Sequence, residues 1–336
     1  MDIVHHLDEH LWREFIDKNP MGNIFHTPEM FQVFARTNRY EPELWAAVDS
    51  SGAPLALLLP VRISVIGGWM RALTTRAVVF GSVLCEPGAT GNEALALLLK
   101  AYTRPTLSAP LFTELRNLWD INAILSSTFR EQGFIYEEHL NYLIDLDRPA
   151  DAIFLGFTAH TRKNIRRGLN RGEFVIEEMR ELEQVATCYN LLKKTYQNAQ
   201  VPLADRSLFE AAFDILYPKD MVQFTRARVG DTFVATSIEL LYKDVVYGWY
   251  AGSDRAYGHY QPNDLLMWHI LQWGAEKGYR VYDFGGAGKP NEEYGVRDFK
   301  AKFGGTLVCF GRYIYVPAPF LLRIGTLGYN IVRKFF

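Results

Sequence analysis

Apolar and polar residues follow two distinct periods along this chain, and the second half shows both clearly. Residues 182–198 place Leu182, Val185, Tyr189 and Leu192 on one helical face, as expected of a helix that packs on a core. Apolar segments at 222–229, 232–241 and 245–251 are separated by short polar breaks, which predicts antiparallel strands joined by turns. A helix is predicted over 263–277, because Pro262 stands near its first turn and Gly278 just past its last.

The same criteria assign the rest of the chain to alternating helices and strands. Helices are predicted at 8–19, 28–37, 93–102, 121–132, 162–170 and 207–216. Strands are predicted at 44–48, 55–63, 78–84, 111–115, 142–146, 174–178, 281–284 and 307–315. Clustered strands with interleaved helices indicate a mixed α+β fold. We expect one domain over 1–149, a second over 150–318, and a tail over 319–336, with the boundary near Arg148–Ala150.

Length, composition and charge limit the number of domains and the kinds of function that the chain can have. The 336 residues are enough for two ordinary domains, and 49% of them are hydrophobic. The formal net charge is −2, so the chain lacks the strong positive charge that is typical of a DNA-binding protein. Three distant cysteines and an N-terminus without a signal-peptide core predict a cytoplasmic protein. The scattered histidines show no metal-ligand spacing, so we expect no metal and no redox cofactor.

One segment near the end of the chain suggests chemistry. Lys300 stands between Phe299 and Phe303, and two glycines follow. The phenylalanines can hold the segment in a core while the lysine faces outward, and a fixed cation can stabilise the oxyanion that forms when a carbonyl is attacked. Lys302 is expected to be an ordinary surface lysine. If the segment is extended, both lysines share a face, so periodicity alone does not choose between them.

Several short blocks recur in a characteristic order. They read HTRKNIRR (160–167), YGWYAGS (247–253), PNDLLMW (262–268), YDFGG (282–286) and FKAKFGG (299–305), with a weaker block GNIFHTPEM at 22–30. This order resembles the Fem family of non-ribosomal peptidyltransferases. Those enzymes move an amino acid from aminoacyl-tRNA onto the stem peptide of a peptidoglycan precursor, and they are built from paired GNAT-like acyltransferase domains. The resemblance implies two GNAT-like domains with mostly antiparallel sheets flanked by helices.

The resemblance also implies roles for individual residues. The family's catalytic lysine directly follows a phenylalanine, which carries over to Lys300, with Phe299 as a substrate-binding neighbour. Asp283 ends a strand beside two glycines; it could accept a proton or orient the amine, or it could cap the loop. Arg162 and Arg166 share a helical face that could hold phosphate or could simply be solvated. Tyr250 could line the acceptor cleft or pack in the core.

Two positions differ from the expected patterns. Where Fem enzymes tend to end a first-domain strand in Asp-Pro, this chain has Glu114-Leu-Arg116-Asn117. The loop that binds the diphosphate of acyl-CoA in GNAT enzymes ends in a small residue, but here Tyr260 stands in its place. We expect Tyr260 to block close approach of a diphosphate, which favours a tRNA-borne donor.

The expected activity is therefore transfer of an aminoacyl group from tRNA, or of an acyl group, onto an amine of a cell-envelope precursor in cell wall biogenesis. One alternative is an N-acyltransferase that uses acyl-CoA in exopolysaccharide or lipid modification. Another is a binding protein that has the fold without the chemistry. The tail, FLLRIGTLGYNIVRKFF, could lie on the inner face of the membrane as an amphipathic helix. It could equally dock on the domain or on a second subunit.

Overall fold

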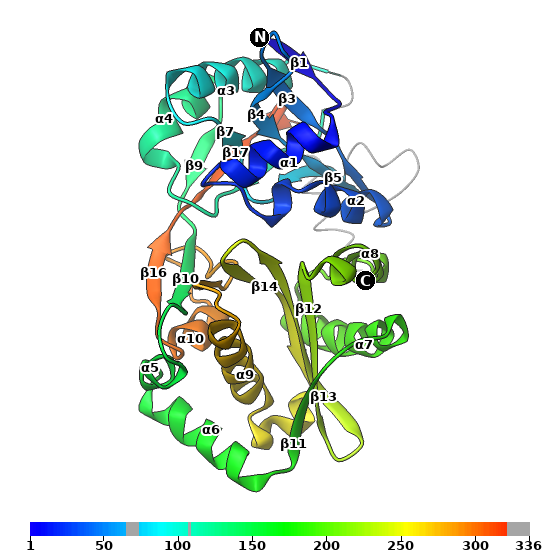
Figure 1. The fold of residues 1–336 in the computed structure, drawn as a ribbon, viewed down its shortest axis with the longest axis vertical. Coiled ribbons are helices and arrows are strands. Elements are labelled where there is room, and N and C mark those ends of the chain that lie inside the picture. The colour runs from blue at the N-terminus through cyan, green and yellow to red at the C-terminus, as the bar shows by residue number, and fades with distance from the viewer. Residues whose placement is uncertain (65–73, 107–108, 321–336) are drawn as a thin grey trace. The chain divides into compact units, whose positions relative to one another are not determined.

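The chain folds into two compact units, seen in a computed structural model that describes residues 1–64, 74–106 and 109–320 (Figure 1). Unit 1 comprises Met1–Glu138 and the described part of Phe310–Phe336, and unit 2 comprises His139–Cys309. No helix within the described ranges is both long enough and apolar enough to cross a bilayer. From residue 321 onward, the expected tail lies outside the described residues.

Unit 1 carries two sheets. Its elements are β1 (Asp2–Val4), α1 (Glu9–Lys18), η1 (Ile24–His26), α2 (Pro28–Arg36), β2 (Tyr40–Pro42), β3 (Trp45–Val48), β4 (Pro54–Leu58), β5 (Val61–Ser64), β6 (Thr75–Val79), β7 (Leu84–Cys85), α3 (Ala89–Tyr102), β8 (Thr113–Arg116), α4 (Asn122–Glu131), β9 (Ile135–Glu137) and β17 (Arg312–Tyr315). The strand orders are β1-β3-β4-β7 and β2-β5-β6-β8-β17-β9. Buried residues of α3 and α4 share one core with both sheets.

Unit 2 is built on one sheet with the strand order β11-β12-β13-β14-β15-β10-β16. Its elements are β10 (Leu140–Asp145), α5 (Ala150–Leu155), α6 (Ala159–Arg171), β11 (Phe174–Glu178), α7 (Leu182–Ala199), α8 (Arg206–Leu216), η3 (Tyr217–Lys219), β12 (Val222–Val229), β13 (Thr232–Tyr242), β14 (Val245–Ser253), η4 (Arg255–Tyr260), α9 (Pro262–Glu276), β15 (Val281–Asp283), α10 (Gly295–Ala301) and β16 (Thr306–Cys309). Helix α9 lies against one face of the sheet, and α7 and α8 lie against the other (Figure 1).

Strands β14 and β15 separate in the middle of this sheet. They pair in parallel from Val245 opposite Val281 to Tyr247 opposite Asp283. Beyond Tyr247, β14 continues beside β13 to Ser253, and a bulge at Trp249 shifts its register. Strand β15 instead ends in the loop 284–286. Beyond Tyr247 and Asp283, β14 and β15 are therefore no longer paired, and the loop 284–286 and the end of β14 diverge.

The division into units differs from the expected boundary. Strand β10, expected in the first domain, pairs with β15 and β16 in unit 2. The single strand expected at 307–315 is two strands, since β17 pairs with β8 and β9 in unit 1. Gly311 separates them with a φ of +67°, a conformation that interrupts a strand and favours glycine.

Candidate active site

Lys300 is held at the loop where β15 leaves the sheet. The half-buried side chain extends from α10, and its Nζ donates to Phe284 O at 2.6 Å and to Gly286 O. Burial lowers the pKa of Lys300 to about 8, and the neighbouring Asp283 carboxylate opposes the shift. The lysine is therefore a positioned amine whose charge changes near neutral pH.

Asp283 holds the same loop from its other side. The buried carboxylate accepts from Asn141 Nδ2 at 2.6 Å and from Gly285 N at 2.7 Å. Asn141 Oδ1 in turn accepts from Gly286 N at 2.9 Å. Burial raises the pKa of Asp283, while the two hydrogen bonds and Lys300 act in the opposite direction. These contacts match the loop-capping alternative for Asp283.

Gly285 is required by close packing at this loop. It has a φ of +75°, and a Cβ there would lie 2.9 Å from Tyr247 Oη and 3.0 Å from Gly248 O. A side chain would both strain the backbone and displace β14. The paired glycines of the YDFGG block therefore let the main chain bring the Phe284 and Gly286 carbonyls to Lys300.

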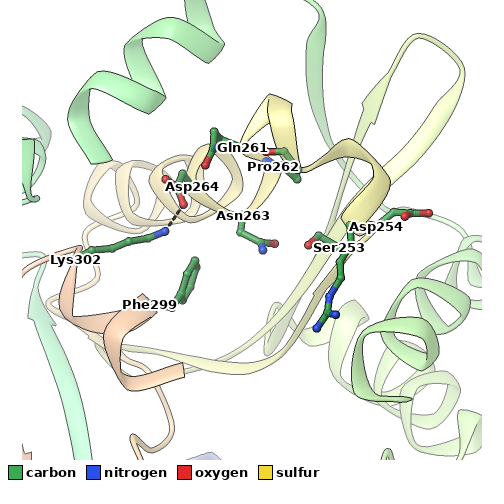
Figure 2. Close-up of a pocket in the computed structure, with 10 residues that line it drawn as sticks. Ser253, Asp254, Gln261, Pro262, Asn263, Asp264, Phe299 and Lys302 are labelled. Atoms are coloured by element: carbon green, nitrogen blue, oxygen red, sulfur yellow. Dashed lines mark hydrogen bonds and ion pairs between the residues drawn. The ribbon is translucent and has the colours of Figure 1, made fainter. Parts of the chain in front are cut away.

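A polar pocket of about 240 Å³ lies between the end of β14, η4, the first turn of α9 and α10 (Figure 2). Its lining consists of Ser253, Asp254, Arg255, Gly258, Gln261, Pro262, Asn263, Asp264, Phe299 and Lys302. Phe299, predicted to bind substrate, is thus a wall of this pocket. Sequence reasoning missed Asp264, although a carboxylate in the first turn of a helix is a recognisable pattern.

Lys302 is an ion-pair partner, which corrects the expectation that it is an ordinary surface lysine. Its Nζ lies 2.5 Å from Asp264 Oδ1 and 4.3 Å from the centroid of the Phe299 ring. Asp264 is 3% exposed, and its Oδ2 has no hydrogen-bond partner among the described residues. Because α10 is a helix and not an extended segment, Lys300 and Lys302 face different neighbours.

Arg162 and Arg166 do not converge on a common site. Arg162 Nη1 donates to Leu155 O at 2.9 Å and to Phe157 O, so it satisfies carbonyls at the end of α5. Arg166 is exposed, and its guanidinium lies 5.3 Å from the centroid of the Phe154 ring. Among the described residues, no main-chain carbonyl accepts a hydrogen bond from the Arg166 guanidinium.

Tyr250 packs against the helices on the far side of the sheet from α9. Its ring lies 4.8 Å from that of Phe209 in α8 and 5.8 Å from that of Tyr196 in α7. It does not line the pocket. These contacts fit the packing alternative.

Tyr260, which was expected to block the approach of a diphosphate, lies outside the lining of this pocket. Its ring lies 5.8 Å from the guanidinium carbon of Arg171. The tyrosine therefore does not obstruct the pocket. The group that stands at the first turn of α9 is the Asp264 carboxylate (Figure 2).

Comparison with known proteins gives consistent results. Residues 157–300 match the family described as acetyltransferase (GNAT) domain, whereas no curated protein matches the sequence. FemX has a TM-score of 0.72 at 15% identity, over 94% of this chain and 97% of that one. L-PGS from Bacillus licheniformis has a TM-score of 0.57 at 16% identity, over 97% and 99%. A tandem GNAT protein from the clavulanic acid biosynthesis pathway has a TM-score of 0.59 at 12% identity, over 95% and 99%.

The expected α+β fold with two GNAT-like domains is confirmed. Residues 157–300 match the acetyltransferase (GNAT) domain family, and the chain as a whole has the fold of FemX and of the tandem GNAT protein.

Proposed function

We propose that this protein transfers an aminoacyl group from tRNA onto an amine of a cell-envelope precursor, with Lys300 stabilising the oxyanion. The observation that carries the proposal is the fixed position of the Lys300 ammonium beside the loop 284–286. The similarity in fold to FemX and to L-PGS supports aminoacyl chemistry at the cell envelope. The site of action would be the cytoplasm.

Aminoacyl transfer requires a cation or hydrogen-bond donor beside the carbonyl oxygen that becomes negatively charged. The acceptor amine attacks the ester carbonyl of the donor, a C–N bond forms, and negative charge develops on the carbonyl oxygen. The ester C–O bond then breaks, the ribose hydroxyl leaves with a proton, and the amine loses one. An ammonium group has three N–H donors. Two of those of Lys300 hold the Phe284 and Gly286 carbonyls, so the third remains for the oxyanion.

The pocket supports a donor other than acyl-CoA. A helix N-terminus binds a diphosphate through free N–H groups and its dipole. At α9, however, Pro262 has no N–H, and the N–H of Asp264 already donates to Gln261 O at 3.0 Å. The Asp264 carboxylate also adds negative charge where the diphosphate would lie. Lys302, the nearest cation to this carboxylate, is already paired with it.

Calorimetry with CoA and acetyl-CoA tests this reasoning. We expect no binding in the low micromolar range, which would correspond to about −7 to −8 kcal/mol. The matched variant Asp264→Asn removes the repelling charge and should bind CoA more tightly than the wild type. Tight binding by the wild-type protein would instead establish the rival function, an acyl-CoA-dependent N-acyltransferase in polysaccharide or lipid modification. The match of residues 157–300 to the acetyltransferase family is the observation in favour of that rival.

The pH dependence of transfer tests the role of Lys300. Because burial lowers its pKa to about 8, the ammonium predominates below pH 8 and is lost as the pH rises through that value. If the cation stabilises the oxyanion, kcat/KM should fall above a pKa near 8. A rise through the same pKa would mean that the neutral amine acts as a base, and the oxyanion role would then be wrong.

A further inference from the structure

A cluster of arginines surrounds one buried carboxylate on the six-stranded sheet of unit 1. Glu114 of β8 lies opposite Val78 of β6, and Arg76 stands two residues before Val78. Arg116 stands two residues after Glu114 and lies opposite Arg312 of β17. Since side chains two apart on a strand share a face, Arg76, Arg116 and Arg312 lie on the same face as Glu114. These three residues are the arginine cluster.

Two members of the cluster form ion pairs with the Glu114 carboxylate. Arg116 Nη2 lies 3.3 Å from Glu114 Oε2, and Arg312 Nη1 forms an ion pair with Glu114 Oε1. Burial opposes ionisation of Glu114, but Arg116, Arg312 and Arg76 together outweigh it and lower its pKa. Glu137, in register with Arg312 on β9, adds a second carboxylate at the sheet edge. Both oxygens of Glu114 are therefore satisfied without Arg76.

The cluster retains more donors than these carboxylates use. Arg76 is half-buried, and it acts on Glu114 electrostatically rather than through a direct hydrogen bond. The Nε atoms of Arg76 and Arg116 are both buried without an acceptor among the described residues. Arg116 is also fixed in place, since its guanidinium carbon lies 5.2 Å from the centroid of the Phe80 ring. A buried, unpaired guanidinium donor is costly unless a ligand satisfies it.

The cluster is also accessible to a ligand. The side chains of Arg116 and Arg312 remain 34% and 25% exposed, whereas Glu114 beneath them is 9% exposed. Guanidinium groups present rigid forks of N–H donors that match the oxygens of a phosphoryl group. Fixed positive charge, unsatisfied donors and solvent access thus occur together at one place on unit 1.

We propose that the arginine cluster of unit 1 is a binding site for a phosphoryl group, with Arg76 and Arg116 as its principal ligands. The group could belong to a phosphate ester in a substrate or to free phosphate. The proposal does not depend on the acyl transfer proposed for unit 2.

The test is calorimetric titration of the full chain with inorganic phosphate, pyrophosphate and glycerol phosphate. We expect saturable binding that weakens with ionic strength. Arg76→Gln combined with Arg116→Gln should weaken it by about tenfold or more. The control Arg36→Gln, at an exposed arginine in the last turn of α2, should bind as the wild type does. Binding of glycerol phosphate would identify a phosphate ester as the source, and binding of inorganic phosphate alone would identify free phosphate.

Glu114→Gln gives an independent readout with the opposite sign. Removing this carboxylate takes away a negative charge beside the bound anion, so phosphate should bind more tightly than in the wild type. If the cluster served only to neutralise Glu114, no phosphoryl ligand would bind the wild type, or the double arginine variant would bind it equally well. Either result, or weaker binding by a folded Glu114→Gln variant, would overturn the proposal.

Discussion

Lys300→Met should lower the rate of acyl transfer by about 10²–10³-fold, because removal of one oxyanion donor has an effect of this size. Methionine has a similar length but no charge and no N–H donor. The loss should appear in kcat, because the oxyanion exists only along the reaction path and not in bound substrate. The measurement is the single-turnover rate of transfer at saturating donor and acceptor.

Two further variants make this result specific. Lys277→Met applies the same substitution at an exposed lysine just past α9, and it should leave the rate unchanged. Lys300→Arg keeps a cation and should retain more activity than Lys300→Met. Lys300→Met also frees the Phe284 and Gly286 carbonyls, so its thermal unfolding must show that the protein is folded at the assay temperature. Equal activity in Lys300→Met and the wild type would refute the assignment.

Lys302→Met should act on stability instead, lowering the free energy of unfolding by about 3 kcal/mol. The substitution leaves Asp264, which is 3% exposed, as a buried carboxylate without its counter-charge. The change should appear as a lower midpoint of urea unfolding with an unchanged slope.

The double variant Lys302→Met with Asp264→Asn separates the ion pair from other effects of the methionine. Because the asparagine is neutral, this variant should recover a large part of the lost stability, and a double-mutant cycle gives the coupling between the two residues. Lys302→Met with unchanged stability, or a double variant as unstable as the single one, would show that the pair does not support the fold.

Local patterns along the chain predicted much of unit 2. The strands at 222–229, 232–241 and 245–251 agree with β12, β13 and β14 to within two residues, because turns and apolar periodicity are encoded within a few neighbouring positions. The helix predicted at 263–277 is shifted by one residue from α9. Its proline and glycine act directly on the backbone that they occupy.

Features that depend on contacts between residues far apart in the sequence were not predicted. Nothing near β10 or β17 in the sequence shows which sheet each strand joins, because their partners lie far away along the chain. The Lys302–Asp264 pair likewise joins positions 38 residues apart. Lys300 was predicted from its flanking phenylalanines and from the resemblance to the Fem family, but its carbonyl partners depend on how the loop 284–286 folds.

Helix α6, which carries Arg162 and Arg166, shows a further limit of predictions from local sequence patterns. A helical period places Arg162 and Arg166 on one face, but it does not show which acceptors are near. The carbonyls of Leu155 and Phe157 come from the preceding helix and its connection. Helix α5 had not been predicted, so a phosphate site could not be distinguished from this main-chain contact.

The most direct test of the account is transfer from tRNA charged with labelled amino acids to amine-bearing cell-envelope precursors. We expect label to move to a precursor in the presence of the wild-type protein, not with Lys300→Met, and not after the charged tRNA has been digested with ribonuclease. The proposed aminoacyl transfer would be contradicted if no charged tRNA served as donor while acyl-CoA donated an acyl group to the same precursors.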